Sequence, residues 1–357
     1  MSKPYDKYVK VVEAEFPRMT LHSTIPSGAS LAVVFDHYRL KRDRKSNHRR
    51  AVNLFFMAGT GMTKAIWQYH IKRLFQYSED NEDSLSWQLV NAVAIDLVSH
   101  GESAVENNGR LGYAADWREG AHDLIQVAKS LRLQGSNVVI GHSMGGYQSL
   151  YACTLAPLMF EHAIIIEPVI YGDDSYTAKM EKMNRSLNKI IKTEFPSENE
   201  FDSYFRKKSI FKNFNKEILD DFLESEKIIK KDGSTYAKTS KEHQMICYLC
   251  GGPAIKIWKE VLSNVNVPVI HVMGKQSTWT PEGSSEKIRN QLKYVKPLDI
   301  DGGHLLNCEA PGSIIKVILD SLNNNVDGQN GNIDQDLGKP YRELFEENYK
   351  KLYSSRL

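Results

Sequence analysis

Short apolar runs alternate with helix-like segments along most of the chain. The runs are rich in β-branched and other apolar residues, which predicts strands at 31–40, 52–59, 90–97, 138–140, 162–167, 267–274 and 294–300. Helical spacing fills most of the intervals between them, for example residues 116–133. Strands that alternate with helices predict an α/β fold with a mostly parallel sheet and right-handed crossovers. Near-continuous apolar strands further predict that helices cover both faces of this sheet.

One interval breaks this alternation. Residues 169–266 are dense in charge, follow helical spacing and show no evident strand. We interpret them as a helical cap inserted over the carboxyl edge of the sheet, where it would shape a substrate pocket. The predicted division of the chain is then a first core part at 1–168, the cap at 169–266 and a second core part at 267–322. Residues 323–357 are predicted to form a polar linker, a short amphipathic helix and a targeting signal.

Composition and charge narrow the range of partners. The sequence is 41% apolar and 25% charged, which is ordinary for a soluble globular protein, and its net charge of +2 gives no argument for nucleic acid or an anionic membrane. The basic run at 41–50 is expected to form a solvated hairpin loop between the strands on either side. No apolar run approaches the roughly 18 residues of a membrane span, and the N-terminus lacks the apolar core of a signal peptide. We therefore expect no transmembrane segment and no conventional secretion.

The cysteines give no evidence for a metal site. Cys247 and Cys250 form a CxxC pair, but no second pair and no histidine pair completes a zinc-binding pattern. The other two, Cys153 and Cys308, are isolated. We expect reduced thiols and no metal or other cofactor.

A serine lies between glycines where a predicted strand ends. The segment NVVIGHSMGG has the spacing Gly141-x-Ser143-x-Gly145, which is typical of a nucleophile elbow. In such an elbow a sharp strand-to-helix turn holds the serine in a strained conformation with its hydroxyl above the sheet. Side chains in place of the two glycines would clash with neighbouring backbone. The strand before and the small-residue helix after supply the context that the motif requires, so we predict Ser143 as a nucleophile.

A serine nucleophile needs a base to remove its proton, and in sheet hydrolases that histidine comes last in the chain. His304 lies in a Gly-Gly-His loop directly after the last predicted strand, from which it could hang over the elbow. We predict His304 as the base. The other histidines fit this role poorly, and His142, beside the nucleophile, is expected only to pack.

The oxyanion of an acyl-transfer intermediate needs two backbone N–H donors. One is expected from Met144, the residue after the nucleophile. The other is expected from the turn that follows the strand at 52–59, where the amide of Thr60 is our choice and where Gly59 and Gly61 let the backbone approach a substrate. The alternative is that these glycines only form a tight turn.

The acid that orients the histidine is the least obvious member. Its usual place follows the strand at 267–274, where the sequence offers Gln276, Ser277 and Thr278 instead of an aspartate. Glu167 ends the preceding apolar strand, and burying a lone charge there is costly unless it has a partner. The His304 imidazole would be such a partner, so we predict Glu167 as the acid. A structural role, capping a nearby loop amide, is the alternative.

Several segments together resemble the α/β-hydrolase superfamily and, within it, the peroxisomal lipase-type hydrolases of yeasts. They are NLFFMAGTGMTKAIWQYHIKRL, IDLVSHGESAVENNGRLGYAADW, NVVIGHSMGG, IIIEPV and GGHLLNCEAP. The resemblance implies an α/β-hydrolase fold, with Ser143 at the family's nucleophile and His304 at its base. The family often has a histidine that braces the oxyanion turn, and Ala58 stands at that position here.

The chain ends in Ser355-Arg356-Leu357, which is similar to the tripeptide that the peroxisomal import receptor reads. With the resemblance, this tail predicts the peroxisomal matrix. We expect a serine hydrolase that cleaves carboxylic esters of acyl lipids. The alternatives are an acyl-CoA thioesterase and a non-catalytic ligand-binding homologue, the latter suggested by Ala58 and the absent aspartate.

Overall fold

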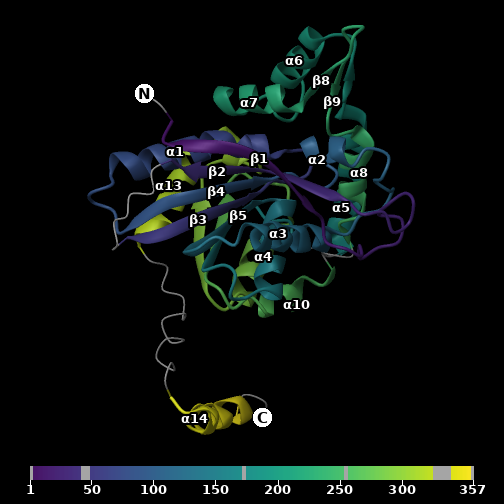
Figure 1. The fold of residues 1–357 in the computed structure, drawn as a ribbon. Helices are drawn as coiled ribbons and strands as arrows, with labels where there is room; N and C mark the ends of the chain where they lie inside the picture. Colours follow the sequence, from purple (N-terminus) through teal and green to yellow (C-terminus); the bar gives the residue numbers. More distant parts are fainter. Residues whose placement is uncertain (1–2, 42–48, 171–173, 253–255, 325–338, 355–357) are drawn as a thin grey trace.

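An eight-stranded, mostly parallel sheet organises the structure, as predicted. The computed structural model describes residues 3–41, 49–170, 174–252, 256–324 and 339–354. The strand order is β1-β2-β4-β3-β5-β6-β10-β11, and β2 runs antiparallel to β1 and β4 while the strands from β4 to β11 are parallel (Figure 1). The strands are β1 Tyr5–Glu13, β2 Ala32–Leu40, β3 Arg50–Met57, β4 Trp87–Ile95, β5 Ser136–His142, β6 His162–Ile166, β10 Val269–Gly274 and β11 Val295–Ile300.

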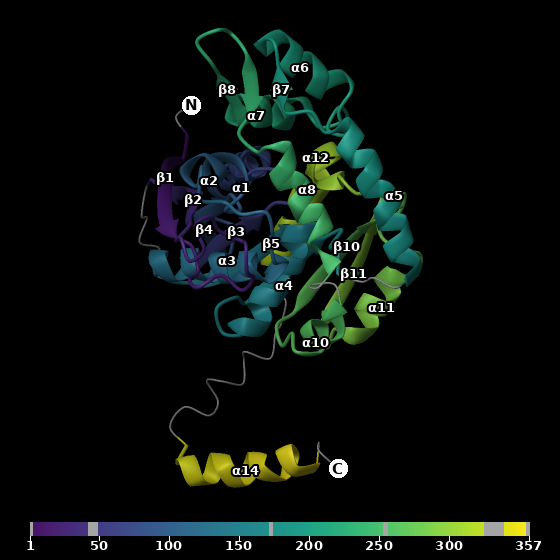
Figure 2. The ribbon, with the colours of Figure 1, turned by 90° about the vertical axis from the view of Figure 1, so that its right-hand side faces the viewer.

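Helices cover both faces of this sheet, which confirms the interpretation of the continuous apolar strands (Figure 2). Val138 and Ile140 of β5 pack into one hydrophobic cluster and Val139 into the other, because successive side chains of a strand point to opposite faces. The first face carries η1 Lys64–Trp67, α1 Gln68–Asp80, α12 Leu306–Glu309 and α13 Pro311–Asn323. The second carries α3 Trp117–Leu131, α4 Met144–Leu155, α10 Trp258–Ser263 and α11 Ser284–Gln291.

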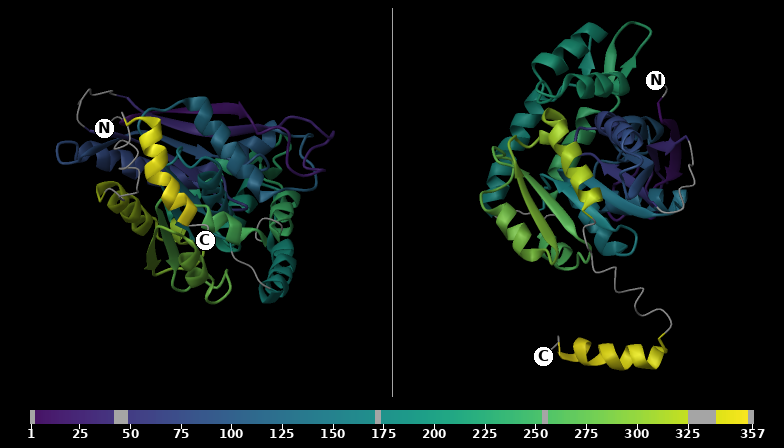
Figure 3. Two further views of the ribbon diagram at one scale, coloured as in Figure 1. Left: turned by 90° about the horizontal axis from the view of Figure 1, so that it is seen from below. Right: turned by 90° about the vertical axis from the view of Figure 1, so that its left-hand side faces the viewer.

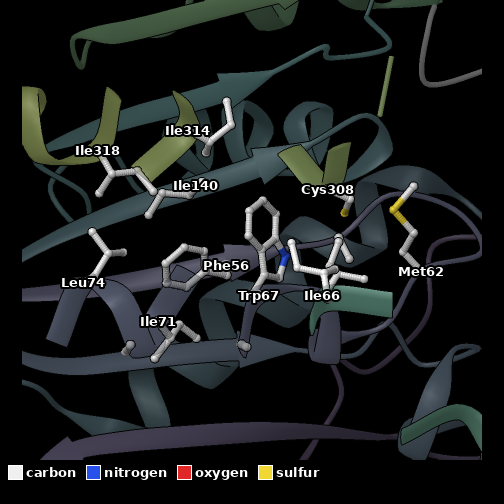
Figure 4. Close-up of a cluster of buried hydrophobic side chains, with 14 of the residues drawn as sticks. Phe56, Met62, Ile66, Trp67, Ile71, Leu74, Ile140, Cys308, Ile314 and Ile318 are labelled. Carbon is white, nitrogen blue, oxygen red and sulfur yellow. The ribbon is translucent and has the colours of Figure 1, made fainter. Parts of the chain in front are cut away.

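The core on the first face is built around an indole. Trp67 is fully buried and packs among Phe56 of β3, Ile140 of β5 and side chains of α1 and α13 (Figure 4). Ring centroids of Phe56 and Trp67 lie 5.2 Å apart. This packing fixes the positions of η1 and α1, which follow directly on the turn after β3. The buried helices therefore also fix the position of that turn.

One expectation for the N-terminal part is wrong, and one strand there was missed. Strands β2 and β3 are not neighbours, because β4 lies between them, so the basic run does not join a hairpin; residues 42–48 of that run lie outside the described residues. Strand β1 was not predicted. It is an edge strand with mostly exposed or partly exposed side chains, many of them lysines and acids, so it lacks the apolar pattern of the inner strands.

Residues 169–266, here called the cap segment, contain strands as well as helices. The helices are α5 Asp174–Ile190, α6 Glu198–Lys207, α7 Lys216–Glu226, α8 Lys241–Leu249 and α10. The strands, β7 Glu194–Phe195, β8 Lys227–Ile229 and β9 Thr235–Ala237, form a small antiparallel sheet, so the expectation of no strand here is wrong. The helical spacing of α7 gives way at Ile228 and Ile229, whose β-branched side chains favour a strand, and Gly233 with φ 85° supports the turn into β9.

The cap segment is tied to the core by hydrogen bonds. Asn215 N donates to Cys308 O at 2.8 Å, the Gly101 amide donates to the Thr239 hydroxyl at 3.0 Å, and the Trp117 indole donates to Cys247 O at 2.8 Å. Figures 1 and 2 show α6, α7, β8 and β9 lying beyond the sheet. The bonds bring cap residues close to the loops that follow the core strands.

The C-terminal helix α14 Tyr341–Ser354 lies where the amphipathic helix was predicted. Tyr341, Phe345 and Tyr349 follow one another along one side, with ring centroids 6.4 and 5.3 Å apart. In Figure 3 it lies apart from the sheet in the right-hand view. Within the described ranges, no helix has the length and apolar character needed to cross a bilayer. All four cysteines lie in described segments and are free thiols.

Candidate active site

Ser143 lies at a sharp turn between β5 and α4. Its backbone has φ 55° and ψ −120°, a conformation that L-residues rarely adopt. A Cβ at Gly141 would lie 2.3 Å from the Gly145 carbonyl oxygen, and one at Gly145 would lie 2.6 Å from the Met57 carbonyl oxygen. Both flanking glycines are therefore required by space, as predicted, and the turn has the strand, strain and helix of an elbow.

His304 lies in the loop between β11 and α12, above the elbow. Its Nε2 is 3.1 Å from Ser143 Oγ, and its Nδ1 is 3.1 Å from Glu167 Oε2. The structure thus brings together the three side chains predicted as nucleophile, base and acid, although 161 residues separate Ser143 from His304.

Glu167 follows β6 and is fully buried. Strand β6 pairs with β5, so the strand leading to Glu167 lies beside the strand leading to Ser143. The Gly274 amide donates to Glu167 Oε1 at 2.5 Å, and the Ser277 hydroxyl donates to Oε2 at 2.5 Å. Glu167 therefore contacts His304, as expected of a triad acid, and also accepts a hydrogen bond from a backbone amide, as expected of the alternative structural role. The structure contains both contacts. Its φ of 49° is a second strained conformation at the site.

Two other carboxylates that follow strands of the sheet have different partners. Asp96 is fully buried and pairs with the Lys64 ammonium at 2.8 Å. Asp301 is exposed and pairs with Lys275 at 3.2 Å. Glu167 is the carboxylate that reaches His304.

The turn after β3 packs against the nucleophile. A Cβ at Gly59 would lie 2.9 Å from Ser143 Cβ, so a side chain here would push the turn away from the serine. Thr60 Oγ1 donates to Met144 Sδ at 3.5 Å, which places the two residues predicted as oxyanion donors side by side. Gly61 has φ 78°, which favours glycine.

A histidine that the sequence did not single out braces this turn. The Gly61 amide donates to His100 Nε2 at 2.9 Å, and His100 Nδ1 lies 3.0 Å from Ser99 Oγ. Burial lowers the pKa of His100 to about 3, so the ring is neutral and Nε2 can accept. His100 thus supports this turn from another part of the chain. Ala58 occupies the position in the turn at which the family often has a histidine.

Two rings lie against His304. His142 does more than pack, contrary to the prediction: its Nε2 donates to the His304 carbonyl oxygen at 2.7 Å, and burial lowers its pKa to about 3, which keeps it neutral. Trp279 stacks on the His304 ring with centroids 4.5 Å apart and planes 6° apart. Both contacts depend on how distant loops meet, and no local pattern in the sequence indicated them.

A mostly parallel sheet in which β2, next to one edge, runs antiparallel to both of its neighbours, an elbow after β5 and a histidine after the last strand together define an α/β hydrolase. The chain belongs to the alpha/beta hydrolase family, whose sequence model matches residues 54–311. The predicted fold and family are therefore confirmed.

Individual proteins agree with this assignment. Peroxisomal membrane protein LPX1 of Saccharomyces cerevisiae is 30% identical over 337 residues, which cover 88% of this chain and 86% of that protein. The solved structure of peroxisomal alpha-beta-hydrolase Lpx1 from the same organism has a TM-score of 0.83 at 27% identity and covers 100% of this chain and 99% of that one. A thioesterase domain from the curacin biosynthetic pathway, at 16% identity, has a TM-score of 0.63, covers 88% of this chain and 100% of its own, and shares the fold alone.

Proposed function

We propose that this chain is a serine hydrolase that cleaves carboxylic ester bonds of acyl lipids. The observation that carries the proposal is the hydrogen-bond chain from Ser143 through His304 to Glu167. Ser143 Oγ lies within proton-transfer reach of His304 Nε2, at 3.1 Å. As Oγ attacks the ester carbonyl, Nε2 takes its proton, and Glu167 holds the ring with Nδ1–H toward the carboxylate and stabilises the imidazolium that forms.

The negative charge that develops on the carbonyl oxygen is held by the amides of Thr60 and Met144. The contact between these residues supports this role, and so does the glycine turn that lies against Ser143. His304 then returns the proton to the leaving alcohol, which leaves an acyl group on Ser143. A water molecule, deprotonated by the same histidine, releases the acid and restores the serine.

The acyl-lipid substrate class is proposed from the resemblance to lipase-type hydrolases; the cavity on the cap side of the oxyanion turn, lined by Gly61 and by aromatic rings of the cap segment, is apolar but has a volume of only about 30 Å³. A peroxisomal location is supported by the names of the yeast relatives, one of which is called a peroxisomal membrane protein, and the matrix is proposed from the C-terminal tripeptide. Residues 355–357 lie outside the described residues. Binding of this tripeptide by the peroxisomal import receptor would deliver the protein.

The test combines active-site labelling with a substrate panel. A fluorophosphonate probe should label the wild-type protein and fail to label Ser143→Ala. Ser130→Ala, on the outer helix α3, is the matched control and should be labelled normally. Because the members of a triad act as a unit, Ser143→Ala should also lower the hydrolysis of p-nitrophenyl esters by several orders of magnitude. Labelling of Ser143→Ala at the wild-type level would refute the proposal, and strong preference for acyl-CoA over oxoesters would make the enzyme a thioesterase.

A further inference from the structure

The loop that follows β4 lies between the turn after β3 and the cap segment. This loop, residues 96–100 and here called the β4 loop, leads into α2 Gly101–Glu106. Asp96 and His100, at its two ends, are at most 1% exposed. Burying polar side chains costs free energy unless they are hydrogen-bonded, so the partners of these two residues show what the loop holds in place.

The β4 loop fixes the turn after β3 at two points. The Gly61 amide donates to His100 Nε2 at 2.9 Å. Three residues later, the Lys64 amide donates to Asp96 Oδ1 at 2.7 Å, and the Lys64 ammonium donates to Asp96 Oδ2 at 2.8 Å. Gly61 directly follows Thr60, and the peptide unit that joins them is planar, so a fixed Gly61 N–H restricts the backbone of Thr60. The amide of Thr60 is the one proposed as an oxyanion donor.

The N-terminus of α2 obtains its hydrogen-bond acceptors from outside the helix. Its N-cap residue, His100, makes no side-chain bond to the helix, because its ring bonds to the turn after β3. The Glu102 amide donates instead to Asp96 Oδ2 at 3.0 Å, and the Gly101 amide donates to the Thr239 hydroxyl at 3.0 Å. The first amides of a helix have no partner within it and need such acceptors. Thr239 therefore supplies to α2 the acceptor that an N-cap side chain ordinarily provides.

Thr239 belongs to the cap segment and is held there on two sides. It follows β9 and is fully buried. Its amide donates to Glu226 Oε1 at 2.7 Å, and its carbonyl oxygen accepts from Gln244 Nε2 at 3.2 Å. Gln244 also lies against the turn after β3, since a Cβ at Gly61 would be 2.9 Å from its Oε1. The cap segment thus reaches this turn directly through Gln244, and through the β4 loop by way of Thr239.

We propose that Thr239 is a positioning residue for the oxyanion donor at Thr60. Its hydroxyl holds the Gly101 amide and with it the neighbouring His100, whose ring holds Gly61. The cap segment therefore sets the geometry of a reacting group in the core. This inference rests on the proposed function for the role of the Thr60 amide, but the hydrogen bonds that join Thr239 to the turn do not require that the serine react.

Thr239→Val tests this role, because valine has nearly the shape of threonine but offers no acceptor to the Gly101 amide. An oxyanion donor acts mainly on the transition state, so kcat on a p-nitrophenyl ester should fall by about 5- to 100-fold while KM changes by less than about twofold. Thr239→Ser restores the hydroxyl and should recover most of kcat. If Thr239 only filled space, the order would be reversed, because valine keeps the volume and serine lacks the methyl group.

Thr235→Val is the matched control. Thr235, in β9, is also fully buried, but its hydroxyl donates to Gly233 O at 3.4 Å, within the cap segment. Its replacement should therefore leave both kcat and KM near the wild-type values.

Hydrogen exchange separates this inference from the proposed function, because it needs no turnover. The Gly61 amide should exchange at least about tenfold faster in Thr239→Val than in the wild type, as read by NMR, and should be unchanged in Thr235→Val. If the wild type hydrolyses no ester but this pattern is found, the proposed function fails, and the positioning of the turn by Thr239 stands.

A second variant covers the case in which Thr239→Val does not fold. The sulfur of Thr239→Cys is a weak acceptor, so its kcat should fall and its Gly61 exchange should quicken in the same direction. Wild-type kcat, or wild-type exchange at Gly61, in a folded Thr239→Val or Thr239→Cys overturns the inference. A valine variant that is more active than the serine variant does so too.

Discussion

Ser143 and Glu167 share an uncommon backbone conformation at the ends of neighbouring strands. Their φ angles are 55° and 49°, and each such residue costs about 1–3 kcal/mol when it is not glycine. The strain is maintained by the surrounding bonds: the Ser143 amide donates to Ile166 O at 3.0 Å, and the Glu167 amide donates to Val272 O at 2.8 Å. Both turns direct a side chain to the same place above the sheet.

The first prediction concerns the acid. Glu167→Gln should lower kcat by about 10²- to 10⁴-fold, because a neutral amide neither stabilises an imidazolium nor fixes the tautomer of His304. Ser277→Ala removes one of the hydrogen bonds to Glu167 and should cost less than about tenfold. Adding Ser277→Asp to Glu167→Gln should restore part of the loss, since it supplies a carboxylate at the commoner position. Near-normal kcat in Glu167→Gln would exclude Glu167 as the acid.

The second prediction concerns the ring stacked on His304. A cation over an aromatic face gains about 0.5–2 kcal/mol, so Trp279 should favour the imidazolium that forms during the reaction. Trp279→Leu should therefore lower kcat by about 2- to 30-fold, and Trp279→Phe should lower it less. Steady-state kcat on a saturating p-nitrophenyl ester checks this, with thermal unfolding to show that each variant is folded. Equal kcat in the leucine and phenylalanine variants would contradict an electronic role.

At the scale of elements, the inner strands and the edge strand β11 were predictable, whereas the other edge strand, β1, and the strands of the cap segment were not. Strands β5, β6 and β10 are buried on both faces, so their sequences are continuous apolar runs. Strand β1 and the cap strands β8 and β9 lack such a run, because they are edges or short hairpins. The role of Glu167 could be predicted because a charged residue at the end of a buried strand needs a partner. The partners of that charge, Gly274 at the end of β10 and Ser277 in the loop that follows, are brought to it by tertiary packing.

The third prediction belongs to helix α7, which ends at Glu226. Burial raises the pKa of this carboxyl from an ordinary 4.5 to about 7 in the folded protein, an effect that the nearby Asp96 strengthens and that Lys238 opposes. Between these values the unfolded chain releases the proton first, so Glu226 should lower the free energy of unfolding as pH rises from about 4.5 to about 7. Below that window its burial should have no such cost.

Replacing this carboxyl should remove the pH dependence. Glu226→Gln should be more stable than the wild type at pH 8, by about 1–3 kcal/mol, and should show no gain at pH 4. Urea unfolding followed by circular dichroism at both pH values measures the difference. If the stability difference between the variant and the wild type were the same at the two pH values, the pKa of Glu226 would be the same in the folded and the unfolded chain, which contradicts the prediction.

At the scale of the molecule, the site depends on loops from separate parts of the chain. The turn after β3, the elbow after β5, Glu167 after β6, Trp279 after β10 and His304 after β11 all lie where parallel strands end at their carboxyl side. This common edge is where open α/β sheets bind ligands. The sequence indicated the edge through the elbow and the Gly-Gly-His loop. It did not indicate the aromatic cap cavity, because phenylalanines at helical spacing give no sign of which face meets the core.

The last prediction separates targeting from catalysis. The tripeptide Ser355-Arg356-Leu357 follows α14, and every residue of the site described above lies before residue 305. Because an import receptor reads such a tripeptide as an address, a chain ending at Ser354 should stay in the cytosol of a yeast cell while its esterase activity in the lysate is unchanged.

Arg356→Lys is the matched control: it keeps the positive charge and should still enter peroxisomes. Fluorescence of an N-terminally tagged protein against a peroxisomal marker measures import. If the truncated chain still entered peroxisomes when it is the only copy in the cell, the address would lie elsewhere in the sequence. If it entered only beside the full-length chain, it would be carried in as an oligomer.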